Sequence, residues 1–550
     1  MLIVNNAIKY LLNPASKQSF EGSNPFSCPA SSFYNRLVPE SSWRLFNLIW
    51  DLISCSINTV YNSCKMTKLC GEIRDSVTGN KVPARVQILS GSGELIAPGD
   101  SIRKIGSGEP FFYSEGYFEV ETTAGYHQIL IEKGTEYEPW KETISVTNSS
   151  TTTKIEANLN KWNLIGQQGW HPGNTHLHYD EKEENPDERL SLDPRIEDLR
   201  MTAVSILKRW DLEYATNKYS PGFLSEFSDL NHHVQCGEES RHNKKSGFEL
   251  DSIGYGHVML LDINNVISPI STGVLVDKFE PDYPPLTYVC DQAKSQNGLV
   301  IWCHNGQGME APIAGILGKL DAINLFDPFW TPIEYTIWYH MLNCGLKIPA
   351  STGSDWFVSS ANRIYSYTGG KFNYQSWIKS LKDGNSFISN GPALFLEVND
   401  QPMGRTVNVS PESKINTKIS WSSFYDIDQV ELIYNGNIVE NNSINKQEKS
   451  GTIEKDITVP NDGWIAARIK SKTRDSFFQP VWAHSSPTYI STGKENFSEK
   501  NASAKHFVKE IDRSLEWVSK KGKFYSDKQR KEILDLHKKG RSLYKKLQDD

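Results

Sequence analysis

The sequence has few cysteines, little charge imbalance and no apolar run long enough to cross a bilayer. Its eight cysteines include no Cys-x-x-Cys pair, so neither a zinc ribbon nor a dense disulfide framework is indicated. Cys290, Cys303 and Cys344 lie among apolar neighbours, as buried thiols do. A formal net charge of -7 and a pI near 6.1 indicate no basic surface for nucleic acid or anionic lipid. We therefore expect no nucleic-acid partner.

Residues 1–68 carry no clear domain pattern. Residues 43–60 form an apolar run, but Asp51 interrupts it, and it is shorter than the roughly 20 residues that a membrane span needs. We expect no stable transmembrane anchor. The run could instead be the apolar part of a secretion signal behind an over-long start, with Met66 as another start. The location stays open between a secreted or periplasmic protein and a cytoplasmic one.

A chain of 550 residues is too long for one hydrophobic core and should form several domains. Residues 69–160 alternate apolar and polar positions in short runs separated by turn residues, which predicts an antiparallel β-sandwich. Residues 75–86 (DSVTGNKVPARV) resemble the opening of carboxypeptidase-regulatory-like or transthyretin-like modules. Such modules mostly support or bind, so we assign no chemistry to this part.

The C-terminal part shows two simple patterns. Period-2 alternation over 409–492, with a hairpin signal at Asn435 and Gly436, predicts an immunoglobulin-like β-sandwich. Residues 493–550 have apolar positions at helical spacing, and 526–529 (SDKQ) form a capping box. We expect a C-terminal helical hairpin packed on the body of the protein. A basic amphipathic helix on a membrane surface is the alternative.

Between these modules, residues 161–408 alternate short apolar runs with segments of helical length. The runs at 257–261 and 299–303 are typical of strands buried on both faces, whereas 286–296 and 332–344 have helical spacing. This alternation predicts a parallel sheet or an α/β barrel. In such folds, catalytic side chains gather where strands end.

Nine of the thirteen histidines lie between positions 171 and 340, where they predict a metal site. His176 and His178 are two residues apart after a turn, so on a strand both project from one face. Two further candidates, His304 and Asp355, follow apolar runs. His257 precedes such a run, and Glu239 lies in a loop-like stretch. Imidazole and carboxylate ligands suit Zn, Mn or Fe, and a bridging carboxylate allows two ions to lie together.

Six motifs in this order resemble the PHP (polymerase and histidinol phosphatase) metallohydrolase superfamily, and most closely its CehA/McbA-type branch. They are GNTHLH (173–178), GEE (237–239), GHV (256–258), WCH (302–304), TGSD (352–355) and NSFISNGP (385–392). The resemblance covers roughly residues 160–410 and implies a distorted α/β barrel with hydrolytic activity and one to three divalent ions. The metal ligands that it implies are His176, His178, Glu239, His257, His304 and Asp355.

Three features depart from the family pattern. Asn174 stands where the family usually has Asp, and Trp356 and Phe357 replace the His that often follows Gly-Ser-Asp. The family's Thr-Asp-His triplet is missing, and 229–233 (DLNHH) is the nearest substitute. It stays open whether His232 or His233 is a ligand, and with it the number of ions.

With metal-activated water as the nucleophile, no serine or cysteine nucleophile is required. We expect Glu239, His304 and Asp355 to carry the chemistry, with Asp355 or an unligated histidine passing a proton to the leaving group. Arg363 is expected to contact an anionic group near the metal, and a plain surface arginine is the alternative.

The predicted function is hydrolysis of a phosphoester, ester, amide or carbamate bond in a small-molecule or saccharide-like substrate. The competing prediction is a non-catalytic protein, in which a metal-containing or decayed barrel and its flanking sandwiches bind glycan or a surface. The replacement of the His that often follows Asp355 favours the binding protein, whereas retention of the other six positions favours the hydrolase.

Overall fold

The computed structural model describes residues 66–148, 152–163, 165–209, 213–244, 253–276, 280–326 and 334–549. The predicted N-terminal segment lies outside the described residues except for 66–68, and so does the apolar run at 43–60. Among the described helices, none is both long and apolar enough to cross a membrane. The fold is mixed α/β, with several sheets and a C-terminal pair of helices.

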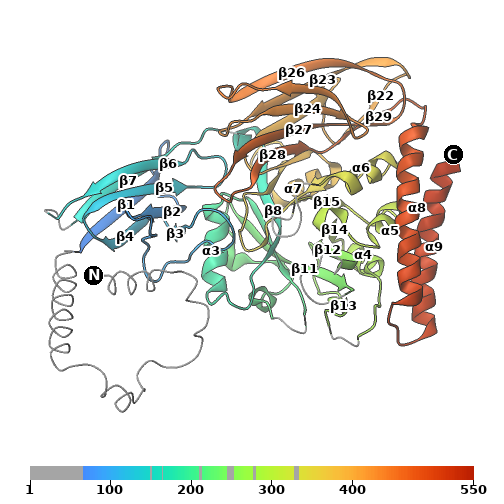
Figure 1. The fold of residues 1–550 in the computed structure, drawn as a ribbon, viewed down its shortest axis with the longest axis horizontal. Coiled ribbons are helices and arrows are strands. Elements are labelled where there is room, and N and C mark those ends of the chain that lie inside the picture. Colours follow the sequence, from blue (N-terminus) through green and yellow to red (C-terminus); the bar gives the residue numbers. More distant parts are fainter. Residues whose placement is uncertain are drawn as a thin grey trace, which may run out of the picture. The chain divides into compact units, whose positions relative to one another are not determined.

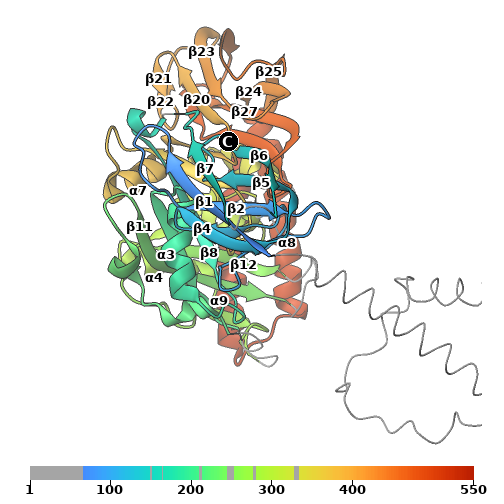
Figure 2. The same ribbon diagram turned by 90° about the vertical axis from the view of Figure 1, so that its left-hand side faces the viewer.

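The N-terminal module is a β-sandwich whose strands face the viewer in Figure 2. One sheet consists of β4 (Tyr117–Thr122), β1 (Thr67–Asp75) and β7 (Thr152–Leu159). The other consists of β3 (Phe112–Ser114), β2 (Ala84–Leu89), β5 (Gly125–Glu132) and β6 (Trp140–Val146). In β4, Phe118 and Val120 are buried while Tyr117 and Glu119 point outward, as period-2 alternation requires. The inward side chains of both sheets share one core, which confirms a sandwich for residues 69–160. β1 and β7 are parallel, however, so the predicted wholly antiparallel arrangement is wrong.

A mixed sheet forms the centre of the protein. Its main strands are β8 (Trp170–His178), β9 (Met201–Ile206), β11 (His233–Asn243), β12 (Ile253–Leu261), β14 (Leu299–Trp302), β15 (Ala322–Asn324) and β16 (Ala350–Ser351). β8, β9 and β11 are parallel, β12 is antiparallel to β11 and β14, and β14, β15 and β16 are parallel again. This corrects the prediction of a wholly parallel sheet. The connection from Asn243 to Ile253 is too short for the crossover that parallel neighbours need.

The end of the sheet returns to β8. After β16, the chain enters β17 (Asp355–Trp356), which pairs in parallel with β8 and places Asp355 opposite Leu177. The backbone N–H of Ser354 donates to the carbonyl of His176 at 3.1 Å. Since β9 pairs with β8 as well, β8 lies between β9 and β17.

Helices and further short strands complete the central module. The helices are α3 (Pro186–Ile196), α4 (Leu286–Ser295), α5 (Ala311–Ile316), α6 (Thr336–Asn343) and α7 (Tyr374–Asp383). α4 and α6 confirm the helical segments predicted at 286–296 and 332–344. β18 (Arg363–Tyr367) pairs with β8 and with β19 (Ser386–Ser389).

The second sandwich begins at Ala393, before the predicted boundary at 409. Its first sheet contains β21 (Gln401–Pro402), β20 (Ala393–Val398), β23 (Ser413–Ser422) and β26 (Ser450–Val459). Facing them are β22 (Thr406–Asn408), β24 (Gln429–Tyr434), β25 (Asn437–Ser443), β27 (Gly463–Arg474), β28 (Pro480–Ser485) and β29 (Thr488–Ser491). The predicted hairpin is confirmed: Asn435 and Gly436 both have positive φ, 51° and 86°, between the paired strands β24 and β25.

The C-terminal helices α8 (Phe497–Lys520) and α9 (Asp527–Asp549) lie side by side in Figure 1. The predicted helical hairpin is therefore confirmed. Ser526 Oγ accepts from the backbone N–H of Gln529 at 3.3 Å, so it acts as the expected cap. α8 packs on α6 and α9 packs on α5, and the Tyr544 hydroxyl donates to the carbonyl of Pro312 at 2.8 Å.

A buried ion network joins the first sandwich to the central module. Arg85 on β2 donates to Glu197, just after α3, at 2.6 Å and to Glu132 on β5 at 2.8 Å. Arg363 donates to the other carboxylate oxygen of Glu197 at 3.2 Å. The side chains are buried, so removing one partner leaves an uncompensated charge away from water.

Replacing Arg85 by methionine should lower the free energy of unfolding by about 3–5 kcal/mol, because Glu132 and Glu197 lose their shared cation. Thermal and urea unfolding followed by circular dichroism measure the loss. Lys379→Ala is the control, because its ion pair with Asp383 is exposed, and such pairs contribute about 0.5 kcal/mol. Equal losses in the two variants would contradict this account of the network.

Candidate metal centre

Two histidines of β8 and one aspartate of β17 form the first group of potential ligands. His176 and His178 project from the same face of β8, and their Nε2 atoms lie 3.2 Å apart. Because β17 lies beside β8, Asp355 Oδ1 comes within 3.3 Å of His176 Nε2 and 3.7 Å of His178 Nε2. The three ligand atoms are close enough to hold one ion together.

Glu239 lies between this group and a second one. Its Oε2 is 2.9 Å from His178 Nε2, while its Oε1 is 3.2 Å from His257 Nδ1 and 3.7 Å from His304 Nε2. Glu239, His257 and His304 form the second group of potential ligands. All six predicted ligands thus converge, and the carboxylate of Glu239 is in the position of a bridge.

The strands explain why residues far apart in sequence meet here. Glu239 lies on β11, which corrects the prediction of a loop-like stretch. In β11, Glu239 and Arg241 are two apart and face the same side. β12 pairs with β11 so that His257 lies opposite Arg241, and this pairing places His257 beside Glu239. His304 follows the end of β14, where the backbone turns with a positive φ of 53°.

Hydrogen bonds behind the rings determine which nitrogens face the centre. His178 Nδ1 is 3.1 Å from the carbonyl oxygen of Ser205, and His257 Nε2 is 2.7 Å from Oδ1 of Asn243. Both oxygens can only accept, so these ring nitrogens donate N–H. In a neutral imidazole the other nitrogen then presents a lone pair, which is the arrangement of a metal-binding histidine. His178 Nε2 and His257 Nδ1 therefore both present lone pairs to the cluster, where His178 Nε2 is 2.9 Å from Glu239 and His257 Nδ1 is 3.2 Å from Glu239 and 2.7 Å from His304 Nε2.

The charge states suit a cation at the centre. Burial lowers the pKa of His176 below its usual 6.5 and lowers that of His257 much further, so these rings are neutral at pH 7. Burial raises the pKa of Glu239, but the positive charge of Arg241 is the largest opposing cause, and this pKa lies well below its usual range. Glu239 Oε1 accepts no hydrogen bond from any described residue. Arg241 provides one positive charge at the edge of the cluster, and a buried carboxylate together with imidazole lone pairs is the donor set that a divalent ion takes, so these residues fit such an ion.

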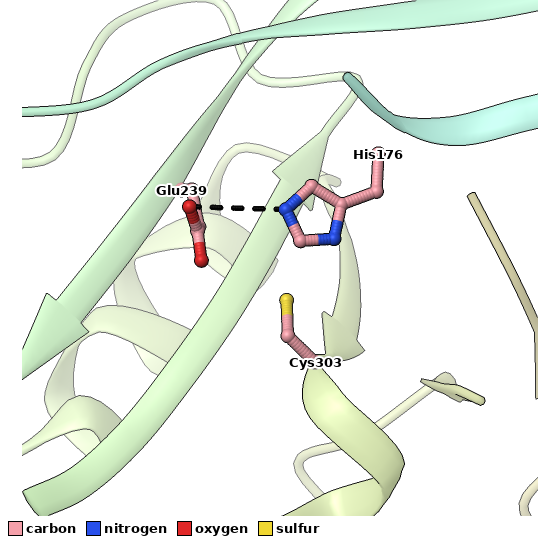
Figure 3. Close-up of side chains that lie close together, drawn as sticks. All are labelled: His176, Glu239 and Cys303. Carbon is pink, nitrogen blue, oxygen red and sulfur yellow. Dashed lines mark ion pairs between the residues drawn. The ribbon is translucent and has the colours of Figure 1, made fainter. Parts of the chain in front are cut away.

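Cys303 adds a sulfur atom to the edge of this cluster. Its Sγ, a His176 ring nitrogen and a Glu239 carboxylate oxygen lie within 4.8 Å of one another. Figure 3 shows the three side chains close together. The thiol is buried, as predicted for Cys303. Its neighbours include two of the predicted ligands as well as apolar side chains, so a sulfur atom belongs to one of the groups that could hold an ion.

Arg363 is engaged elsewhere. Its guanidinium donates to the carboxylate of Glu197 and to the carbonyls of Glu197 and Ala361, and the side chain is buried. This corrects both interpretations of Arg363, the anion-contacting residue and the surface arginine. Its charge is balanced by Glu197 inside the protein.

His232 and His233 also have other partners. His232 Nδ1 is 2.6 Å from the carbonyl oxygen of Leu199, and the His233 ring stacks on Tyr374 with 3.8 Å between ring centroids. Among the described residues, neither histidine belongs to a group that could hold an ion. The six predicted ligands form their groups without them.

Sequence reasoning missed Arg241, Asn243 and Ser205. The alternation Glu239, Arg241, Asn243 was the available signal, but it required β11 to be recognised as a strand. Asn174, the departure from the family pattern, has a positioning role: its Oδ1 accepts from the His176 backbone N–H at 3.1 Å and its Nδ2 donates to Ser354 Oγ at 2.8 Å. It ties β8 to the segment that carries Asp355.

No family model matches the chain. No curated protein matches it either. Among solved structures, the chain is similar to the apo structure of Bacteroides uniformis beta-glucuronidase 3 at 9% identity, over 77% of this chain and 63% of that chain, with a TM-score of 0.14. The chain thus spans about 63% of the length of that protein. A similarity this weak carries no argument, so the function is argued from the residues alone.

Replacing His176 or His304 by alanine should weaken metal binding by more than about 100-fold, because even residues that only orient ligands contribute 10- to 100-fold. Metal content after dialysis, measured by mass spectrometry, tests this. His506→Ala is the control: this ring stacks on His340, 4.3 Å between centroids, on α8 and should leave the metal content unchanged. Full metal content in both ligand variants would overturn the assignment.

Asn243→Ala should weaken metal affinity by about 10- to 100-fold, because His257 Nε2 loses the oxygen that fixes its ring and tautomer. Competition with a coloured chelator gives the affinity. Asn243→Asp keeps an acceptor oxygen and should bind metal close to wild type. If the alanine and aspartate variants behave alike, Asn243 does not orient His257.

Proposed function

We propose that the chain is a metal-dependent hydrolase that uses metal-activated water on a phosphoester, ester, amide or carbamate bond. The observation that carries this proposal is the position of Glu239, with one carboxylate oxygen beside His178 and the other beside His257. A carboxylate between two groups of nitrogen ligands is suited to bridge two ions, and two-ion sites catalyse hydrolysis.

The six residues of the cluster have different roles in this proposal. His176, His178 and Asp355 would hold one ion, His257 and His304 would hold another, and Glu239 would contact both. When bound, such ions lower the pKa of a coordinated water toward about 7 and polarise the scissile oxygen. Asp355 lies beside the histidines, so we assign it to take the proton of the attacking water and to pass that proton to the leaving group. Ser205 and Asn243 keep the rings of His178 and His257 oriented.

The proposed fold of the central module is a distorted α/β barrel of the PHP type. Support comes from β17, which follows the last strand of the sheet and pairs with β8. The ligands lie on β8, β11, β12 and β17 and directly after β14, so the sheet directs all of them to one point. The order of the six motifs in the sequence agrees with this arrangement.

A metal-containing binding protein without catalysis is the second candidate. The observation that favours it is burial, because His178 is 0% exposed and Glu239 is 1% exposed. Closed metal sites are typically structural, whereas catalytic ones keep a position open for water or substrate. The two candidates therefore differ in whether the loaded site can reach a substrate.

Purified protein loaded with Zn, Mn or Fe should hydrolyse at least one of five generic chromogens: a phosphomonoester, a phosphodiester, a carboxylic ester, an amide or a carbamate. Removing the metal with a chelator should lower the rate by at least about 100-fold, since the nucleophile depends on it, and adding metal back should restore it. His304→Ala should be inactive in the same assay, and His506→Ala should be fully active. Protein with measured full metal content that turns over none of the chromogens would support the binding protein instead.

A further inference from the structure

The ligand-facing side of β11 carries one charged residue that the proposed mechanism does not use. Arg241 is two residues from Glu239 and therefore faces the same side of the strand. Its side chain lies opposite His257 in the pairing of β11 with β12. Only 6% of Arg241 is exposed, so the guanidinium is held inside the protein beside the metal-ligand cluster.

The guanidinium of Arg241 is incompletely paired. The Nε of Arg241 is 3.7 Å from Glu239 Oε1, which is too long for a hydrogen bond. This Nε has no hydrogen-bond partner among the described residues. A buried N–H without an acceptor is costly, and charged donors are the costliest. Arg241 thus lacks an acceptor on the side that faces the cluster.

A second donor lies next to Arg241. β13 (Ser271–Gly273) runs parallel with β11 and places Ser271 in register with Arg241, so both side chains project from the same face. Ser271 is 1% exposed, and its hydroxyl has no hydrogen-bond partner among the described residues. Two neighbouring strands therefore present two unsatisfied donors to one side.

Metal binding would increase the need for an anion. One divalent ion cancels the charges of Glu239 and Asp355, which leaves the positive charge of Arg241 without its partner. A second ion would add more positive charge. A buried cation in such a site requires an anion, and a guanidinium matches the paired oxygens of phosphate or carboxylate.

We propose that Arg241 and Ser271 form an oxyanion-binding subsite beside the metal ligands, and that the substrate carries a compact anionic oxygen group at the reacting centre. This rests on the proposed function, and it narrows the substrates to anionic ones, phosphate-like or carboxylate-bearing. Arg241 would thus contact the anionic group, as the sequence predicted for Arg363. It lies on β11, the strand that also carries Glu239.

Binding of inorganic phosphate and of acetate to the metal-loaded protein, measured by calorimetry, tests the subsite. Arg241→Gln should weaken binding of the preferred anion by about 10- to 100-fold, and Ser271→Ala by about 3- to 10-fold. Arg241→Lys keeps the charge beside Glu239 but loses the planar fork, so it should fall between wild type and Arg241→Gln. Arg405→Gln, an exposed arginine of the second sandwich, is the control and should bind like wild type.

Metal content is measured for every variant, so that loss of metal is not read as loss of the subsite. If Arg241→Gln loses metal, Arg241→Lys and Ser271→Ala decide, and wild-type anion binding in both overturns the proposal. A tenfold preference for phosphate identifies a phosphate-like group, and the reverse preference identifies a carboxylate. Either preference supports the subsite when it depends on Arg241.

The hydrolysis assays separate this proposal from the proposed function. Turnover of a neutral carboxylic ester that exceeds turnover of both phosphate chromogens, with no effect of Arg241→Lys, overturns the subsite and leaves the hydrolase standing. Anion binding that depends on Arg241, without turnover of any chromogen at full metal content, keeps the subsite and overturns the hydrolase.

Discussion

The centre of this protein depends on the mutual repulsion of buried lone-pair donors, which Arg241, 3.7 Å from Glu239 Oε1, offsets at one edge and a metal ion would offset at the centre. Imidazole nitrogens whose tautomers are fixed from behind present lone pairs to the cluster around the carboxylate of Glu239 in a buried setting. Water has little access there to screen them, and the low local dielectric strengthens the repulsion. The same arrangement becomes favourable when a cation lies between the donors. A site with this property is better explained by a metal ion than by the packing of a core.

The flanking modules hold the strands that carry these donors. β18 lies against β8, and its first residue, Arg363, is fixed by Glu197, which Arg85 of the first sandwich also binds. On the other side, β19 pairs with β28 of the second sandwich. β18 therefore connects β8 to both sandwiches. This gives the sandwiches a structural role in the geometry of the centre, whatever else they bind.

Local pattern was enough to predict much of this structure. Alternation identified both sandwiches, helical spacing identified the terminal hairpin, and motif order identified six residues that converge, though not Cys303 or Arg241. The predictions that were wrong concerned features that depend on pairing between strands far apart in the sequence. The strand character of β11 was hidden because Glu238, Glu239 and Arg241 are polar, yet they are buried by strands from distant parts of the sequence. For the same reason Arg363 was preferred to Arg241: sequence shows which side chains are cationic, but only strand register shows what each one faces.

Because the ligands come from separate strands, the centre exists only when the sheet has formed. His176 and Asp355 lie 3.3 Å apart across β8 and β17, although most of the central module separates them in sequence. An ion that binds this assembled centre, and not the unfolded chain, stabilises the sheet by its binding free energy. Without an ion, the repulsion among the donors acts against the same strand pairings. Metal binding would therefore be coupled to the order of the central sheet.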